Sequence, residues 1–265
     1  TADGNDTTNA WTPTDAGDSV IARVNASGTT ADATAVTISG WTTNTANYIQ
    51  INGNNTTGKW NTAYYRLTGS DVDLTVATNH NVVIKNFQVK NMGTNYPVAI
   101  TLQSTTTVDI AYSIIATNPS VTTGTGISLG DGGIYRVWNN MFIDNKRASS
   151  GGGISLNYPN NATTLSLYNN TFVDNGLAIE IKGSNFTKNL SNNLTSGGPG
   201  FSIATDPQVM TNNASSDATA DDYGGTGNRV NQTFTFVDET NKDFHLTSND
   251  AGAKDYGISN PGSGL

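Results

Sequence analysis

The sequence predicts an all-β solenoid, in which a short unit of chain repeats and each repeat forms one coil carrying several strands. Two series of apolar triplets interleave between Val82 and Ile203 of the 265-residue chain. The first series is centred on Ile100, Ile127, Ile154 and Ile179, in steps of 27, 27 and 25 residues. The second is centred on Ile84, Ile110, Val137, Leu167 and Leu190. Two strand patterns that share one period indicate stacked coils with a continuous core.

The chain is predicted to be a single domain with three parts. Residues 1–35 are read as an N-terminal cap and first strand, because the exposed end of a solenoid core must be covered. Residues 36–207 are read as the coils, and residues 208–265 as a C-terminal loop, an extra strand and a closing segment. Strands are predicted from alternating polar and apolar residues at 16–24, 35–40, 48–53, 64–67 and 73–76. Beyond the coils, 212–228 is read as a surface loop and 230–237 as a strand outside the coils.

Asn-rich corners are predicted between the strands. Residues 138–145 (Trp-Asn-Asn-Met-Phe-Ile-Asp-Asn) match 168–175 (Tyr-Asn-Asn-Thr-Phe-Val-Asp-Asn) at five of eight positions. Asn tolerates left-handed backbone and bonds its own turn, and stacked Asn side chains form hydrogen-bonded ladders. We therefore assign structural corners to Asn139, Asn140, Asn169, Asn170, Asn192 and Asn193. An Asn-lined binding groove is the functional alternative.

The composition disfavours several classes of partner. The net charge is −8 with only 13 Lys and Arg, whereas nucleic-acid backbones are bound by clustered cations. No apolar run approaches the roughly 18 residues that a membrane span needs. The chain lacks cysteine, which leaves the redox compartment undecided. A start at Thr1 rather than Met favours a secreted protein whose signal peptide has been removed, and hence an extracellular or cell-surface location.

The triplets and the Asn-Asn-x-Phe-[Ile/Val]-Asp-Asn corners resemble those of right-handed parallel β-helix proteins, the pectin-lyase-like superfamily and its secreted, repeat-containing relatives. The resemblance covers roughly residues 16–205 and implies a right-handed parallel β-helix of about six to seven coils. Residues 243–247 and 253–257 are similar to the closing segment of such proteins, which packs back along the helix. The opening, at residues 3–6 and 16–20, is similar as well. This class holds lyases, hydrolases, adhesins, phage proteins and assembly subunits, so the resemblance predicts fold rather than function.

No catalytic residue is assigned from the sequence. The strand face that carries catalytic groups in enzymes of this superfamily is expected to show Thr101, Ser128, Ser155 and Glu180. Glu180 and Lys182 are the only charged pair there and are expected to form a weak surface ion pair. Cleavage by paired carboxylates needs two acids flanking one bond, and no row of equivalent positions supplies them. If the protein is an enzyme, we expect a polysaccharide lyase or glycoside hydrolase whose site lies in the neighbourhood of Arg66, Asp71 and Asp73.

No cofactor or metal is assigned either. His80 and His245 are the only histidines, too few for a zinc site without cysteine, and His80 is expected to be solvated in a turn. Residues 3–6 and 217–222 carry oxygen ligands suited to calcium, but without the EF-hand spacing. Turn chemistry explains both segments better, and calcium stays the weaker alternative.

Acceptor sequences for N-glycosylation are numerous. A chain this rich in Asn, Ser and Thr has about eight by chance, so eleven give no sign of selection. The candidates are Asn5, Asn25, Asn54, Asn55, Asn161, Asn169, Asn185, Asn189, Asn193, Asn213 and Asn231.

The sequence favours an extracellular structural protein without catalytic activity, a self-assembling subunit of a surface filament or layer whose partners are copies of itself. Its candidate contacts are Thr1, Trp11, Phe234, Phe236 and Leu265. The alternative is a polysaccharide-binding or polysaccharide-lyase-like protein, favoured by the superfamily and by aromatic residues that stack on sugars when exposed. Those aromatic residues are Trp11, Trp41, Trp60, Tyr64 and Tyr65. A phage or surface adhesin is disfavoured because nothing resembles a trimerisation stalk.

Overall fold

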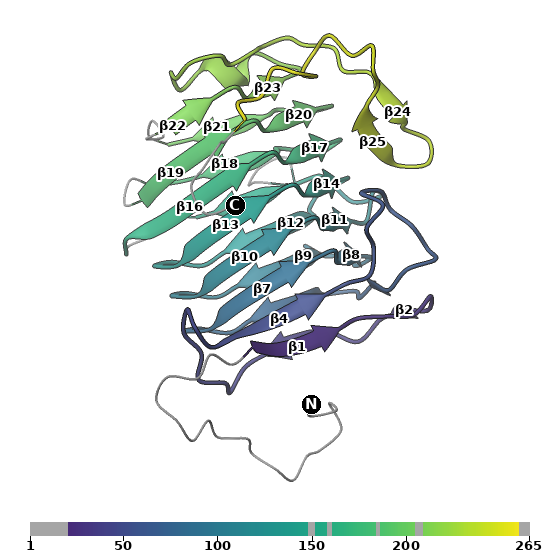
Figure 1. The fold of residues 1–265 in the computed structure, drawn as a ribbon, viewed down its shortest axis with the longest axis vertical. Coiled ribbons are helices and arrows are strands. Elements are labelled where there is room, and N and C mark those ends of the chain that lie inside the picture. The colour runs from purple at the N-terminus through teal and green to yellow at the C-terminus, as the bar shows by residue number, and fades with distance from the viewer. Residues whose placement is uncertain (1–20, 148–151, 158–160, 184–185, 205–208, 260–265) are drawn as a thin grey trace.

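The chain forms a parallel β-solenoid whose coils stack along one long axis (Figure 1). The computed structural model describes residues 21–147, 152–157, 161–183, 186–204 and 209–259. Each coil contributes one strand to each of three parallel sheets, A, B and C, which hold eight, eight and seven strands. The predicted all-β solenoid of about six to seven coils is therefore confirmed.

Sheet A contains β1 (Ile21–Asn25), β4 (Tyr48–Asn52), β7 (Asn81–Lys85), β10 (Thr107–Ala111), β13 (Ile134–Trp138), β16 (Thr163–Tyr168), β19 (Phe186–Ser191) and β22 (Val209–Thr211). Sheet B contains β2 (Ala31–Asp32), β5 (Arg66–Leu67), β8 (Gln88–Asn91), β11 (Ile114–Thr117), β14 (Met141–Ile143), β17 (Thr171–Val173), β20 (Leu194–Ser196) and β23 (Ala214–Ser215). Sheet C contains β3 (Val36–Ile38), β6 (Val72–Val76), β9 (Val98–Leu102), β12 (Thr125–Leu129), β15 (Ile154–Leu156), β18 (Ile179–Ile181) and β21 (Phe201–Ile203).

The core is one column of apolar side chains running inside the solenoid. Equivalent residues of successive coils pair in register, as Ile127 does with Ile100 and Ile154, and all three are fully buried. Phe142 stacks on Phe172 of the next coil with ring centroids 4.5 Å apart and planes 9° from parallel.

The first predicted series of triplets forms strands of sheet C, and the second series forms strands of sheet A. Sheet B was not predicted as a sheet, because Met141–Ile143, which lies between an Asn-Asn pair and an Asp-Asn pair, was interpreted as part of a corner, and it is instead strand β14.

An Asn ladder runs through the core side of the corners between sheets A and B, as predicted for Asn140, Asn170 and Asn193. The Asn170 side chain accepts hydrogen bonds from the main-chain N–H and the Nδ2 of Asn140, both 3.1 Å. Its own Nδ2 donates to the carbonyl of Val137 (2.8 Å) and to Oδ1 of Asn193 (3.0 Å). Asn213 continues the ladder into the next coil. Each amide thus satisfies main-chain groups that the corner would otherwise bury without partners.

Replacing Asn170 with Ala should lower the free energy of unfolding by about 3 kcal/mol, because it leaves the buried main-chain N–H of Asn140 without its acceptor and removes the side-chain donor to the Val137 carbonyl. Urea unfolding followed by circular dichroism measures the loss. Asn249→Ala, at an exposed Asn outside the ladder, is the control and should change stability by less than about 0.5 kcal/mol. Equal losses in the two variants would contradict the structural role of the ladder.

The coils continue past residue 207, so the loop predicted over 212–228 is wrong for residues 212–221, whereas residues 222–228 do form turns that are mostly exposed. Strands β22 and β23 add to sheets A and B, and Asn213 and Ala214 are buried. A short 3-10 helix, Thr219–Asp221, follows, and its Ala220 packs against the core. The loop interpretation failed because Asn and Ser, read there as loop residues, are the residues that form the corners and ladder of this solenoid.

The closing segment packs along the solenoid, as the resemblance implied (Figure 1). The strand predicted over 230–237 is shorter: β24 (Phe236–Asp238) pairs antiparallel with β25 (Asp243–Leu246), which makes a hairpin. Phe234, Phe236 and Phe244 pack with apolar residues of sheet B, and Phe236 meets Phe244 edge-to-face. Lys242 adds an ion pair to Asp144 (3.2 Å).

The two Phe residues assigned to assembly are therefore not available for it. Phe234 and Phe236 are only 8% and 9% exposed, because they cover sheet B of their own chain. The other assembly candidates, Thr1, Trp11 and Leu265, lie outside the described residues, as does the predicted cap before Ile21. No helix in the described part of the chain has the length and apolar character that a membrane crossing requires.

Candidate binding groove

A row of left-handed residues marks the outer side of the corners between sheets A and B. One residue of each of six successive coils adopts a φ of 52° to 58°. These residues, which we call the outer corner row, are Asn86, Tyr112, Asn139, Asn169, Asn192 and Asn212. Each precedes the residue that turns into the core, so its own side chain lies on the outside. At the corners predicted for them, Asn139, Asn169 and Asn192 provide left-handed backbone. Their side-chain amides lie on the outside, where they can make other contacts.

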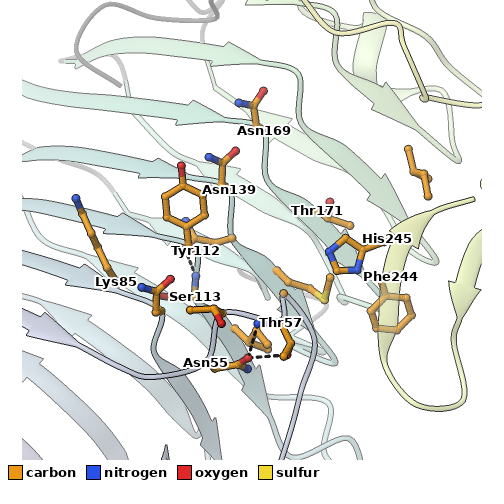
Figure 2. Close-up of a pocket in the computed structure, with 17 residues that line it drawn as sticks. Asn55, Thr57, Lys85, Tyr112, Ser113, Asn139, Asn169, Thr171, Phe244 and His245 are labelled. Atoms are coloured by element: carbon orange, nitrogen blue, oxygen red, sulfur yellow. Dashed lines mark hydrogen bonds between the residues drawn. The ribbon is translucent and has the colours of Figure 1, made fainter. Parts of the chain in front are cut away.

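The first four members of this row form the floor of a groove of about 770 Å³ (Figure 2). One wall is the segment 55–58, and the other is strand β25 with Phe244, His245 and Leu246. Lys85 lies beside Asn86 at the end of the floor, and Met141 and Ile114 give it an apolar base. The floor of the groove therefore presents amides, the Tyr112 ring and one amine on a surface that repeats with each coil.

Tyr112 departs from the pattern of the row. It is a bulky aromatic residue with a φ of 52°, where every other coil of the row has Asn. Its side chain is 53% exposed, so no burial offsets the strain. Left-handed backbone costs an ordinary L-residue about 1 kcal/mol or more, whereas Asn adopts it readily. Tyr96 combines left-handed backbone and exposure in the same way, but Tyr112, unlike Tyr96, lines the groove. The strain at this position in the groove points to a functional role.

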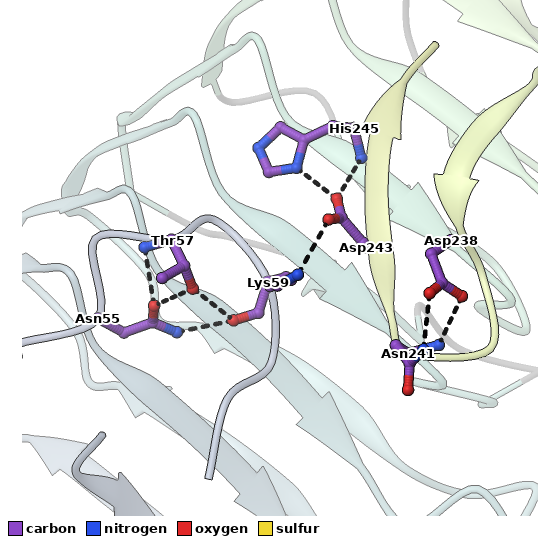
Figure 3. Close-up of polar contacts among 7 residues, drawn as sticks. All are labelled: Asn55, Thr57, Lys59, Asp238, Asn241, Asp243 and His245. Carbon is purple, nitrogen blue, oxygen red and sulfur yellow. Dashed lines mark hydrogen bonds and ion pairs between the residues drawn. The ribbon is translucent and has the colours of Figure 1, made fainter. Parts of the chain in front are cut away.

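The two walls of the groove are joined by an ionic contact (Figure 3). Lys59 Nζ lies 3.3 Å from Asp243 Oδ2, and His245 Nδ1 lies 2.6 Å from Asp243 Oδ1. Partial burial alone would raise the pKa of Asp243, but the hydrogen bonds from His245 and Lys59 outweigh it and lower the pKa. Asp243 is therefore a carboxylate at neutral pH.

Both walls are also stiffened internally (Figure 3). Asn55 donates to the Lys59 carbonyl (2.8 Å) and accepts from Thr57 N (2.9 Å) and Oγ1 (2.6 Å). At the hairpin turn, Asn241 donates to Asp238 from both its main-chain N (3.1 Å) and its Nδ2 (2.6 Å). The groove is thus held open by fixed hydrogen bonds, which reduces the ordering needed on binding.

Arg66, Asp71 and Asp73, the residues suggested for an enzyme, do not form a common catalytic site. Arg66 donates to the carbonyls of Thr29 and Thr62, both 2.7 Å, which fixes a loop. Asp71 is exposed, whereas Asp73 is fully buried with Asn91 Nδ2 3.0 Å from its Oδ1. The Oδ2 of Asp73 is buried and lacks a hydrogen-bond partner among the described residues. Burial raises the pKa of Asp73 to about 7, and the nearby Asp71 adds to the effect.

Two expectations about titratable residues are corrected. His80 is 6% exposed rather than solvated. Its Nδ1 lies 2.7 Å from the Thr78 carbonyl, and its Nε2 accepts a hydrogen bond from the main-chain N–H of Trp41 at 3.3 Å. Glu180 is 4% exposed, so its 3.0 Å contact with Lys182 is not a fully solvated surface pair. Neither group lines the groove.

The segment 217–222, suggested above for calcium, is a turn that is stabilised by side-chain hydrogen bonds of Asp217. Asp217 Oδ1 accepts from Thr219 Oγ1 (2.7 Å) and Oδ2 accepts from Gly200 N (3.1 Å). Among the residues that the structure describes, no three His, Cys, Asp or Glu side chains gather where they could hold a metal ion. The other segment suggested for calcium, residues 3–6, lies outside the described residues.

The glycosylation candidates fall into three groups. The amides of Asn55, Asn193 and Asn213 are buried and hydrogen-bonded, so a glycan on them is incompatible with the fold. Candidates that are exposed or half-buried are Asn25, Asn54, Asn161, Asn169, Asn189 and Asn231. Asn5 and Asn185 lie outside the described residues.

Of the aromatic residues suggested for sugar stacking, Trp41, Trp60, Tyr64 and Tyr65 do not line the groove, and Trp11 lies outside the described residues. Trp41 is 56% exposed beside His80, Trp60 packs on the hairpin cluster and Tyr65 packs on the core. Tyr112 does line the groove, but it was not predicted as a site residue. The sequence does contain an indication, because Tyr112-Ser113 stands where the later coils have Asn-Asn.

Comparison of the chain with protein-family models, with curated proteins and with solved structures finds no match.

Proposed function

We propose that this protein is a saccharide-binding β-solenoid whose groove along the outer corner row takes a linear polysaccharide. The observation that carries the proposal is Tyr112, an exposed aromatic ring in a strained backbone conformation at the centre of a floor of amides. Aromatic faces stack on sugar rings, and a ligand-binding site of this kind combines such a face with a few convergent polar groups.

The chemistry of the floor suits a polyhydroxylated ligand. An Asn amide both donates and accepts, as does a sugar hydroxyl, so each amide can form two hydrogen bonds with one sugar unit. Asn86, Asn139 and Asn169 lie on separate coils, and neighbouring strands are about 4.8 Å apart. A repeating floor favours a repeating ligand. Lys85 adds one cation at the end of the groove.

Two further expectations belong to this proposal. We include membership of the pectin-lyase-like superfamily, supported by the sequence resemblance and by the parallel β-solenoid. We also include secretion, supported by a ligand class that is found outside cells. The self-assembly reading gains no such support, because Phe234 and Phe236 are buried within the chain.

The proposal is tested by titrating the protein with oligosaccharides of increasing length, both neutral (β-1,4-glucan, xylan) and acidic (polygalacturonate, alginate), using isothermal calorimetry. We expect one series to bind, with an affinity that Asn139→Gly lowers about tenfold through the loss of one amide. Gly keeps the left-handed backbone, so the fold is preserved.

The matched control is Asn231→Gly, which removes an exposed left-handed Asn outside the groove. It should bind like the wild type. Absence of binding to every series, or equal losses in Asn139→Gly and Asn231→Gly, would overturn the proposal.

A further inference from the structure

The upper end of the outer corner row is occupied by the chain itself. Ile258 N donates to Asn192 Oδ1, and Asn192 Nδ2 donates to the Ile258 carbonyl, both at 2.9 Å. Asn212 Nδ2 donates to the Tyr256 carbonyl at 2.6 Å. A short irregular segment thus bonds the amides of the upper coils that are equivalent to those of the groove floor in the lower coils.

This segment is held mainly by polar contacts. The Tyr256 ring covers the Arg229 guanidinium at 3.7 Å, and Arg229 in turn donates to the carbonyls of Ala251 and Gly252. A Cβ on Gly257 would lie 3.1 Å from the Asn192 side chain, so the segment packs closely against that amide and a larger residue would require the side chain to shift. Tyr256 and Ile258 remain 50% and 39% exposed. Few buried apolar contacts mean that the segment can open locally at low cost.

The occupied and open parts of the row are continuous. Asn192 Nδ2 donates to Asn169 Oδ1 at 2.9 Å, so the last open position of the groove touches the first covered one. Four members of the row line the groove and two lie under the segment 256–258.

We propose that Tyr256–Ile258 is a strap that ends the groove and thereby sets the length of saccharide it accepts. This inference rests on the proposed function. With strands about 4.8 Å apart, the four open positions span about 14 Å, and releasing the strap extends the row to about 24 Å. A ligand long enough to reach Asn192 and Asn212 must therefore displace the strap or stop before it.

The test compares the wild type with the double variant Tyr256→Ala/Ile258→Pro, which loses the stacking on Arg229 and the N–H that bonds Asn192. Both are titrated with the same oligosaccharide series. In the wild type, affinity should stop rising once the ligand spans the four open positions. In the variant it should keep rising over two more coils, with a gain of about tenfold for the longest ligands and none for short ones.

A second variant, Arg229→Gln, loosens the strap from its other side and leaves both covered amides in place, so it should show a smaller shift in the same direction. Val237→Ala, at an exposed position of the hairpin, is the control and should behave as the wild type. If both strap variants reach their plateau at the wild-type length, the strap inference is wrong while the proposed function stands. If neither wild type nor strap variants bind any series, both fall together.

Discussion

Replacing Tyr112 with Asn should make the protein more stable and a much poorer saccharide binder. The substitution installs the residue that the other coils of the outer corner row use at this left-handed position. Relief of backbone strain should add about 1 kcal/mol to the free energy of unfolding. Loss of the central aromatic anchor should weaken binding about 30-fold or more, the effect of a binding hot spot. Chemical unfolding and calorimetric titration measure the two effects.

The opposite signs make this test specific, because a variant that merely damaged the fold would lose stability and binding together. Tyr96→Asn is the matched control: Tyr96 is also left-handed, with a φ of 50°, and 59% exposed, but lies outside the groove. It should relieve similar strain without a change in binding. Wild-type affinity in Tyr112→Asn would contradict a role for this ring.

The stability of the wild type should fall as the pH rises from about 4 to about 7, because of Asp73. Its folded-state pKa is raised to about 7 from 3.8. Below about pH 4 the carboxyl is protonated in both folded and unfolded chains, and burial carries no penalty. Between the two values only the unfolded chain ionises, so stability is lost progressively and stays low above pH 7. Three pH units correspond to about 4 kcal/mol.

Asp73→Asn removes this dependence, since the amide is neutral at every pH and retains the oxygen that accepts from Asn91. The difference in free energy of unfolding between variant and wild type should grow by about 4 kcal/mol from pH 4 to pH 7.5. Urea unfolding at several pH values measures it. Asp71→Asn, at the exposed neighbour, should show only a small part of the effect. A pH-independent difference for Asp73→Asn would show that this carboxyl is not held protonated by the fold.

Sequence periodicity could predict the solenoid because its core is built from one repeated contact. Ile127 and its equivalents recur at the coil period, and so do the residues of sheet A. Sheet B was not predicted because strands such as Met141–Ile143 are too short to show alternation between the polar corner residues that flank them. The last coil escaped because Asn213 and Ala214 carry the composition of a loop although they are buried.

The groove could not be predicted for a different reason: its walls come from distant parts of the chain. Residues 55–58, the outer corner row and strand β25 meet only through the coil stacking and the docking of the hairpin. The same holds for buried groups. His80 and Asp73 look like ordinary turn and surface residues in the sequence, and only the neighbouring coils enclose them.

A ¹⁵N NMR titration of the side-chain amides with the binding oligosaccharide decides whether the groove is the saccharide site. If the groove is the saccharide site, the side-chain NH₂ signals of Asn86, Asn139 and Asn169 shift in a saturable manner, while the amides of Asn170 and Asn193, which are buried in the ladder and do not line the groove, keep their positions. Shifts confined to other surfaces, such as Asn157 beside sheet C, or no shift at saturating ligand, would contradict the account.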